Sequence, residues 1–320
     1  MERDAVIFLA GASGLVGSAV RRALDARGHR RILAPARAEL DLTNQAAVDG
    51  YFARHRPGYV LHCAGRVGGI QANSRYGADF IRDNLLMGVN LVEASQRHGA
   101  RKILVLGSSC VYPRLAPQPM SEKLLMGGPL EPTNEPYAMA KLAVLSMARA
   151  YQAQHGLQVA LAIGANAYGP GDNFEPETSH VIPALMRRFH EARLRGEPQI
   201  SVWGSGKPVR EFIYSDDLAQ GLLFLLDRDG SVGPVNVGTG EKTTIAALAR
   251  TIAATVGYQG KIVQDASKPD GMPEKVLDIS LIRSMGWKPA SDLASGLRKT
   301  FDWFSAADAT RRGAPRGAAA

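Results

Sequence analysis

Tyr137 and Lys141 are two ionisable residues four positions apart in a segment that predicts a helix over 137–155, so they share one helix face. A free tyrosine has a pKa of about 10 and is a poor acid-base catalyst at neutral pH. A neighbouring ammonium group favours the phenolate and lowers that pKa. We therefore expect Lys141 to activate Tyr137 for proton transfer.

A pair of hydroxyls follows a strand-like segment, Lys102 to Gly107, in the run Leu106-Gly-Ser108-Ser109-Cys110. These hydroxyls should lie at the carboxyl edge of a sheet, where open α/β proteins bind ligands. Ser108 can donate a hydrogen bond to a carbonyl oxygen that Tyr137 protonates. This combination predicts the reduction of a ketone.

A glycine-rich turn, Gly11-Ala12-Ser13-Gly14-Leu15-Val16-Gly17, joins the apolar run Val6 to Ala10 to an amphipathic segment. Glycine lets a backbone approach a pyrophosphate closely, and the N-terminus of the following helix attracts its charge. The spacing differs from the usual dinucleotide fingerprint, and a tight turn alone would also need glycines. The position between strand and helix favours a dinucleotide cofactor.

The residue about 20 positions beyond the last glycine usually selects the cofactor, and here it is Arg37. An arginine at this position accepts the extra phosphate of NADP, so we expect NADP rather than NAD. The alternatives are that Arg37 is only a solvated loop residue, or that nearby Glu39 binds ribose hydroxyls.

Strand-like and helix-like segments alternate along the first half of the chain, which predicts an α/β fold with a Rossmann-type, doubly wound parallel sheet. Strands are expected at 6–10, 31–34, 59–62, 102–107 and 158–163, and helices from 18, at 45–55, 76–98 and 137–155. Later segments alternate less regularly, with helices at 181–195, 215–226 and 245–256 and a strand at 199–202. We expect an NADP-binding domain (1–170), a smaller mixed substrate-binding region (171–308) whose chain can cross back to the sheet, and a flexible tail (309–320).

Six prolines lie between Tyr112 and Tyr137, at 113, 117, 119, 129, 132 and 136. This density predicts a segment without regular structure. A loop this long inside a compact domain is more often functional than idle.

The cysteine count, the length of the apolar runs and the net charge limit which classes of protein the chain can belong to. The 320 residues include only two cysteines, Cys63 and Cys110, too few for a disulfide framework or a four-thiolate zinc site, so we expect no metal and a cytoplasmic location. No apolar run approaches the roughly 20 residues of a membrane span. The net charge of +8 favours anionic partners, but the basic residues are dispersed and no nucleic-acid motif is present.

The glycine turn, the paired serines and Tyr-x-x-x-Lys, in this order, resemble the extended short-chain dehydrogenase/reductase superfamily. A closer resemblance, to the GDP-L-fucose synthase family, rests on further stretches: Gly107-Ser-Ser-Cys-Val-Tyr-Pro113, Leu130-Glu-Pro-Thr-Asn-Glu-Pro-Tyr137, Tyr168-Gly-Pro-Gly-Asp-Asn-Phe174, Ser179-His-Val-Ile-Pro183, Trp203-Gly-Ser-Gly-Lys-Pro-Val-Arg210-Glu-Phe and Asp265-Ala-Ser-Lys-Pro-Asp270-Gly. That family epimerises GDP-4-keto-6-deoxy-D-mannose at C3 and C5 and reduces C4 with NADPH.

The resemblance implies roles for individual residues. Ser108, Tyr137 and Lys141 would form the reductase triad, while Cys110 and His180 would be the acid-base pair of epimerisation. Free thiol and imidazole pKa values of about 8.5 and 6.5 suit both groups to giving and taking protons. In isolation, Cys110 would be interpreted as a small buried side chain and His180 as a polar residue at a helix start.

The resemblance also implies binding residues. Arg188, Trp203, Arg210 and Asp270 match nucleotide-sugar positions, although Trp203 could instead pack in the core. An arginine fork suits a diphosphate because it donates two parallel hydrogen bonds. Further cofactor contacts would come from the glycine turn, Arg37, Lys141 and His180, and from Leu106, Gly107, Ser108, Ser109, Gly164, Ala165, Asn166 and Ala167.

Some positions depart from the family pattern. Ser13 stands where some relatives have arginine, Gly164-Ala165-Asn166 replaces a common Pro-Thr-Asn, and Met272 and Glu274 replace a threonine and a basic residue. Alternative functions are a nucleotide-sugar 4-epimerase or dehydratase, or a catalytically silent NADP-sensing protein. A homodimer formed through the helices at 76–98 and 137–155 is expected by analogy.

Overall fold

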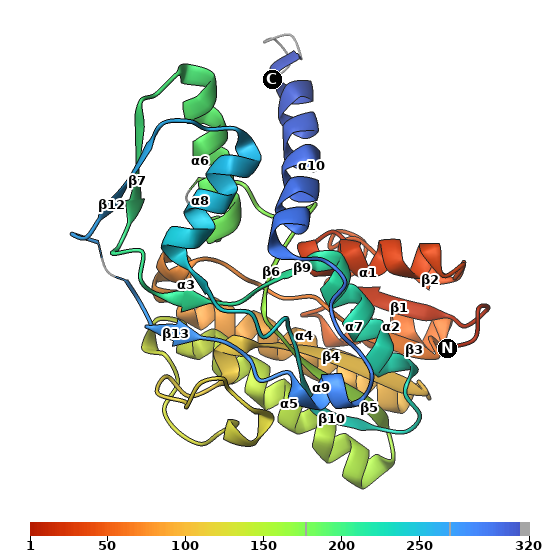
Figure 1. The fold of residues 1–320 in the computed structure, drawn as a ribbon. Helices are drawn as coiled ribbons and strands as arrows, with labels where there is room; N and C mark the ends of the chain where they lie inside the picture. Colours follow the sequence, from red (N-terminus) through yellow and green to blue (C-terminus); the bar gives the residue numbers. More distant parts are fainter. Residues whose placement is uncertain (177, 269, 314–320) are drawn as a thin grey trace.

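Short apolar segments that are buried on both faces form the central sheet. In the computed structural model, which describes residues 1–176, 178–268 and 270–313, six strands pair in the order β10-β5-β4-β3-β1-β2, every pair parallel. The strands are β1 (Ile7–Ala10), β2 (Ile32–Leu33), β3 (Tyr59–His62), β4 (Lys102–Ser108), β5 (Gln158–Gly164) and β10 (Val232–Val237). The predicted parallel α/β sheet is confirmed (Figure 1).

Helices cover both faces of this sheet because strand side chains alternate between the two faces. Ile7 and Leu9 of β1 belong to one buried core, and Phe8 and Ala10 to another. The first core includes residues of α1 (Leu15–Ala26), α7 (Ser215–Asp227) and α9 (Ser280–Ser284). The second includes residues of α2 (Gln45–His55), α4 (Gly77–Arg97) and α5 (Glu135–His155).

A third core lies in the C-terminal half, away from the central sheet (Figure 1). It is built on α6 (Val181–Arg195), α8 (Ile245–Val256), α10 (Leu293–Gly313) and the parallel pair β7 (Gln199–Trp203) with β12 (Lys261–Asp265). Small sheets connect this region to the rest: β6 (Asn166–Tyr168) pairs with β9 (Phe212–Tyr214), and β8 (Val209–Arg210) lies between β11 (Thr243–Thr244) and β13 (Glu274–Lys275).

The proline-rich segment contains more local structure than the sequence predicts. Two single 3₁₀ turns, η2 (Glu122–Leu124) and η3 (Pro132–Asn134), interrupt it, and a third, η1 (Ser109–Val111), precedes it. Helix α5 begins at Glu135, two residues earlier than predicted, with Pro136 in its first turn. Proline fits there because first-turn N–H groups have no partner within the helix.

Several elements were not expected. A short helix, α3 (Ile70–Arg75), precedes α4, and no strand was predicted at the position of β10. Strand β10 returns to the edge of the central sheet beside β5, a return of the kind that the expected domain division allowed for. Helices α9 and α10 also lack a strong sequence signal. Helix α10 continues to Gly313, five residues into the expected flexible tail, and residues 314–320 of that tail lie outside the described residues.

Helices α4 and α5 pack closely because α4 has a glycine at their contact. An added Cβ at Gly88 would lie 2.3 Å from Cγ2 of Val144, a branched side chain buried on α5. By contrast, a Cβ at Gly50, also within a helix, would meet no atom within 4 Å.

We predict that Gly88→Ala destabilises the fold by about 1–3 kcal/mol because Val144 must move. The matched variant Gly50→Ala should be neutral or stabilising by up to about 1 kcal/mol, since alanine favours a helix. Urea denaturation followed by circular dichroism measures both. Equal midpoints for the two variants would contradict this account of the helix contact.

Candidate active site

The turn after β1 can be formed only by glycines at two positions. Gly11 has φ +82°, and a Cβ there would lie 2.7 Å from backbone atoms of Ala64, which follows β3. A Cβ at Gly17 would lie 1.9 Å from the carbonyl oxygen of Gly11. Gly14 caps α1 without a side-chain hydrogen bond, so N–H groups of the first turn lack a side-chain acceptor.

These features fit a dinucleotide cofactor. The turn lies at the point where strand order reverses, since β1 has β2 on one side and β3 on the other, and such points bind nucleotides. A bare helix N-terminus behind a glycine-rich turn provides N–H donors and a positive dipole for a pyrophosphate. The cradle therefore matches the group that the sequence predicts.

Arg37 lies four residues beyond β2 and is exposed. The neighbouring Glu39 is already engaged, because its Oε2 accepts a hydrogen bond from the Ala36 N–H at 2.7 Å. Arg37 is therefore the charged group of this turn that is better placed to meet a phosphate.

The other residues expected to contact the cofactor gather at the carboxyl ends of β4 and β5. Ser108 is the register partner of Gly164, and Gly107 that of Ile163. Asn166 begins β6 and donates its Nδ2 to the Glu211 carbonyl oxygen at 2.8 Å. The structure thus brings residues 106–109 and 164–167 to one sheet edge.

Lys141 is buried on α5 and reaches the same edge. Its Nζ donates to the carbonyl oxygens of Leu106 at 3.3 Å and Ala64 at 3.5 Å. It lies 5.9 Å from the ring centroid of Tyr137. Burial lowers the pKa of Lys141 to about 8.

The pKa of Tyr137 moves in the direction opposite to the one that we expected. Burial raises it, the nearby Cys110 raises it further, and only the hydrogen bond with Ser108 lowers it. The prediction that Lys141 lowers this pKa is therefore wrong for the structure described here, because burial is the dominant effect on the phenol. Tyr137 stays a protonated phenol at neutral pH.

Ser108 connects the phenol to a thiol. Its Oγ accepts a hydrogen bond from the Cys110 backbone N–H at 3.3 Å, and its hydroxyl also contacts the Tyr137 and Cys110 side chains. The structure therefore brings Ser108, Cys110 and Tyr137 together, with Lys141 behind them.

Two polar residues beside Cys110 were missed by sequence reasoning. Asn134 Nδ2 and Lys275 Nζ each lie 3.2 Å from the Cys110 Sγ. Burial alone would raise the pKa of this thiol, but the Lys275 charge and hydrogen bonds from Ser108, Lys275 and Asn134 together lower it. Asn134 lies in a quoted motif and could have been found there, whereas Lys275 has no local signal.

His180 lies at the N-cap of α6 and is solvent-exposed, although protein atoms around the imidazole lower its pKa. The adjacent Ser179 carbonyl oxygen lies 3.7 Å from the position of a Cβ on Gly69, the N-cap of α3. Within the described residues, no hydrogen bond joins His180 to Cys110 or Tyr137. Among the described residues, His180 is therefore outside the hydrogen-bonded cluster of Ser108, Cys110 and Tyr137.

The residues expected to bind the nucleotide sugar gather around the end of β7. Arg188 donates from α6 to the Ser201 carbonyl oxygen of β7 at 2.5 Å. Trp203 ends β7 and is 60% exposed, with Lys268 Nζ 5.7 Å from its ring, so its interpretation as a core residue is wrong.

Asp270 lies beside the turn that follows this tryptophan, and Arg210 lies near Asp270. Asp270 accepts hydrogen bonds from the Ser205 N–H at 2.6 Å and hydroxyl at 2.7 Å, in the turn after β7. Arg210 lies on β8, half-buried, and burial lowers its pKa while Asp270 opposes that change. Two arginines, an aromatic ring and a carboxylate thus flank one turn.

A buried carboxylate joins this group to the central sheet and was also missed. Glu211 Oε1 accepts the N–H groups of Thr239 and Gly240 at 2.6 and 2.8 Å, and Oε2 accepts that of Leu277 at 2.7 Å. Through these bonds it holds the end of β10 and the chain after β13 beside Arg210.

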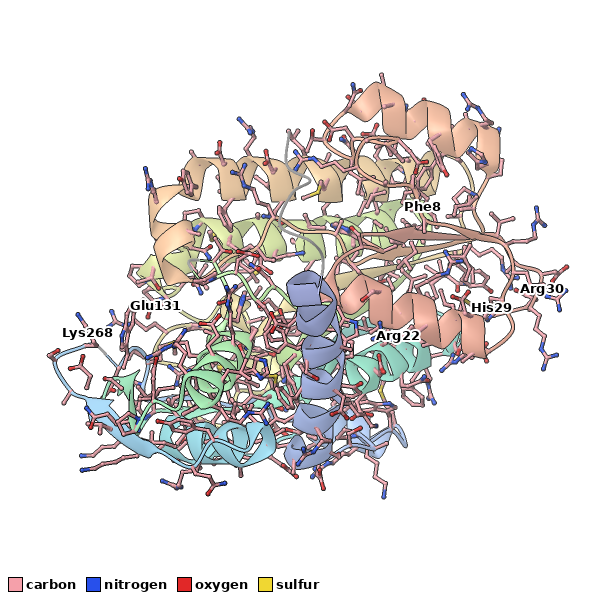
Figure 2. The ribbon with its side chains drawn as sticks, turned by 90° about the horizontal axis from the view of Figure 1, so that it is seen from above. Phe8, Arg22, His29, Arg30, Glu131 and Lys268 are labelled. Carbon is pink, nitrogen blue, oxygen red and sulfur yellow. The ribbon has the colours of Figure 1, made fainter. Side chains whose placement is uncertain are left out.

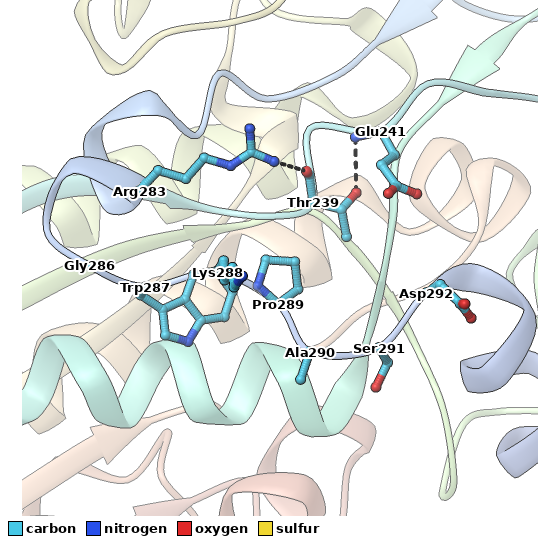
Figure 3. Close-up of a pocket in the computed structure, with 10 residues that line it drawn as sticks. All are labelled: Thr239, Glu241, Arg283, Gly286, Trp287, Lys288, Pro289, Ala290, Ser291 and Asp292. Atoms are coloured by element: carbon cyan, nitrogen blue, oxygen red, sulfur yellow. Dashed lines mark hydrogen bonds between the residues drawn. The ribbon is translucent and has the colours of Figure 1, made fainter.

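A cavity in another part of the described structure has a different lining. It encloses about 530 Å³ and is lined by Thr239, Glu241, Arg283, Gly286, Trp287, Lys288, Pro289, Ala290, Ser291 and Asp292 (Figure 3). None of the predicted site residues lines it. A much smaller cavity touches Cys110, Asn134 and Lys275.

Two features, a membrane-spanning helix and a cluster of metal ligands, are absent from the described residues. No helix there is long and apolar enough to span a membrane. No group of three or more His, Cys, Asp and Glu residues in that part of the chain could hold a metal ion.

Comparison with known proteins agrees with the geometry. Residues 7–238 match the NAD dependent epimerase/dehydratase family. The chain is 48% identical over 303 residues to GDP-L-fucose synthase 1 of Arabidopsis thaliana (95% of this chain, 94% of the relative) and 46% identical over 307 residues to GDP-L-fucose synthase of Escherichia coli K12 (93% and 96%).

Among solved structures, a GDP-L-fucose synthetase from Naegleria fowleri bound to NADP aligns with a TM-score of 0.91 at 29% identity, covering 97% of this chain and 95% of that one. The resemblance seen in the sequence is thereby confirmed over nearly the whole chain. The chain belongs to the NAD dependent epimerase/dehydratase family and, within it, to the GDP-L-fucose synthase family.

Proposed function

We propose that this protein converts GDP-4-keto-6-deoxy-D-mannose to GDP-L-fucose by epimerisation at C3 and C5 and NADPH-dependent reduction at C4. The observation that carries this proposal is that groups suited to two different reactions meet in one cluster. The Ser108 hydroxyl lies between Tyr137, a proton donor for reduction, and Cys110, a base for epimerisation. The relatives named for this reaction support the same conclusion.

In the reduction, bound NADPH supplies hydride to C4. Tyr137 donates a proton to the C4 oxygen, and its raised pKa keeps it in the phenol form that can do so. Ser108 donates a hydrogen bond to the same oxygen and orients it. Lys141, mostly charged at pH 7 because its pKa is about 8, stabilises the phenolate that remains.

In the epimerisation, the C4 ketone acidifies the hydrogens on C3 and C5. Cys110 removes such a proton as a thiolate, the form that its surroundings favour. Inversion requires an acid on the opposite face of the sugar, and His180 is assigned to that role. In that role the imidazolium form of His180 would donate the proton and become neutral imidazole, the form that burial favours by lowering the pKa of His180.

Binding of the two nucleotides uses separate groups. Residues 11–17 and Arg37 hold the cofactor pyrophosphate and extra phosphate, with Lys141 and residues 106–109 and 164–167 at the nicotinamide end. Arg188 and Arg210 bind the GDP diphosphate, while Trp203 and Asp270 contact the nucleotide. The positions of these side chains around β7 and β8 support this assignment.

Two further proposals concern the whole molecule. The exposed apolar side chains Leu86 on α4 and Met139 on α5 support a homodimer formed through these helices, which analytical ultracentrifugation tests.

We also propose a cytoplasmic location, with a reduced Cys110, which cell fractionation tests.

Incubation of the purified protein with GDP-4-keto-6-deoxy-D-mannose and NADPH should oxidise the cofactor and yield GDP-L-fucose. Absorbance at 340 nm and chromatography of the product measure this. Folded protein that oxidises no NADPH between pH 6 and 8 would contradict the proposed function.

Two variants should separate the half-reactions. Tyr137→Phe should lower the reduction rate at least about 100-fold, because the proton donor is lost, while solvent deuterium still enters at C3 and C5. Cys110→Ser should slow that deuterium uptake by a similar factor. Exchange as fast as in the parent with Cys110→Ser would show that the base is another group.

Arg37→Ala should weaken NADPH binding about tenfold or more, which corresponds to the loss of one charged hydrogen bond, and leave NADH binding unchanged. The exposed Arg30, which precedes β2 (Figure 2), provides the matched control Arg30→Ala. Fluorescence titration measures both affinities. An equal loss for NADPH and NADH would argue against a phosphate contact.

A further inference from the structure

The Cys110 thiol has a lysine as its direct neighbour, although the two residues are 165 positions apart in the chain. The Lys275 Nζ lies 3.2 Å from Sγ, within contact for a charged hydrogen bond to sulfur. We propose that Lys275 is a positioning residue that holds Cys110 as a thiolate, ready to take a proton from the sugar. The use of that thiolate on a sugar rests on the proposed function, whereas the coupling of the two side chains does not.

The position of Lys275 is fixed by the backbone around it. Strand β13 pairs in parallel with β8, so that Lys275 lies beside Arg210. The next N–H groups are also bound, that of Val276 by Gln118 Oε1 at 2.9 Å and that of Leu277 by the buried Glu211 at 2.7 Å. Because the backbone here is already fixed, only the rotamer entropy of the Lys275 side chain is lost when its ammonium group reaches the thiol.

Of the charged and titratable groups around the Cys110 thiol, Lys275 is the one whose charge favours the thiolate. Among the described residues that line the small cavity at Cys110, Lys275 is the only cation. Glu131, the acid in that lining, pairs with Arg114 at 3.4 Å. Tyr112 donates to Asn236 at 2.6 Å, and Tyr137 is a neutral phenol. Asn134 and Ser108 add dipoles but no charge.

The other cysteine provides a comparison within the same chain. Cys63 follows β3, and Lys141 attracts its thiolate from nearby, but burial dominates and raises the pKa of Cys63 to about 12. The Lys141 ammonium instead donates hydrogen bonds to the backbone carbonyl oxygens of Ala64 and Leu106. A lysine in the vicinity is therefore insufficient to lower the pKa of a buried thiol. Cys110 differs from Cys63 in that a lysine contacts its sulfur directly.

The test is the pH dependence of Cys110 alkylation by iodoacetamide, without substrate, with the modified cysteine identified by mass spectrometry. Lys275→Met should shift this profile to higher pH and slow the reaction at pH 7 about tenfold, since each pKa unit changes the thiolate fraction about tenfold. Lys275→Arg keeps the charge and should restore most of the rate.

A matched control is Lys242→Met. Lys242 is an exposed lysine that pairs with Glu274, next to Lys275, at 2.6 Å. It lies in the same region but does not contact the sulfur, so the alkylation profile should keep its parental position. A shift equal to that of Lys275→Met would overturn the proposal, because the effect would then be a general one of net charge.

The same variants are then assayed for solvent deuterium exchange at C3 and C5 of the sugar. The inference is supported if the pH profile of deuterium exchange shifts in the same direction as the pH profile of alkylation. A raised KM for the nucleotide sugar with an unchanged thiol profile overturns it, since Lys275 would then only bind substrate. If the parent itself exchanges no hydrogen, the proposed function fails, and the alkylation profiles still decide whether Lys275 controls the thiol.

Discussion

Parallel pairing imposes the main constraint on this molecule, because every strand of the central sheet must end at the same edge. The turn after β1, Ala64 after β3, Ser108 at the end of β4 and Gly164 at the end of β5 all meet there. Lys141 stabilises this edge because its ammonium group donates to the carbonyl oxygens of Ala64, after β3, and of Leu106, near the end of β4. The cofactor cradle and the catalytic cluster are thus one consequence of strand direction.

Within the cluster, surroundings rather than residue type separate the acid from the base. Burial without a compensating charge keeps Tyr137 protonated, whereas a cation and two neutral donors favour the ionised form of Cys110. Ser108 contacts both side chains and so couples them. Two groups whose pKa values are moved in opposite directions at one location can serve two proton transfers of opposite sense.

Much of this arrangement is local enough to be predicted from the sequence. The spacing of Tyr137 and Lys141 and the glycines of the first turn are local features, and they lie as predicted. Lys275 and Glu211 escaped prediction because they depend on strands β8 and β13, which are two residues long and have no periodicity. The direction of the Tyr137 pKa was missed for another reason, since burial is a property of the assembled fold.

The return of the chain to the central sheet at β10 means that the two halves cannot be separated by a single cut. In the part of the chain that the structure describes, only residues 232–237 pair with the outer edge of β5, and α7, which follows β9, packs on α1. A fragment ending near residue 170 would expose a strand edge and an apolar helix face together, a combination that promotes aggregation. Evolution or engineering of a new specificity on this scaffold must therefore proceed by replacing segments inside 171–213 and 239–275, with the intervening strand and helix retained.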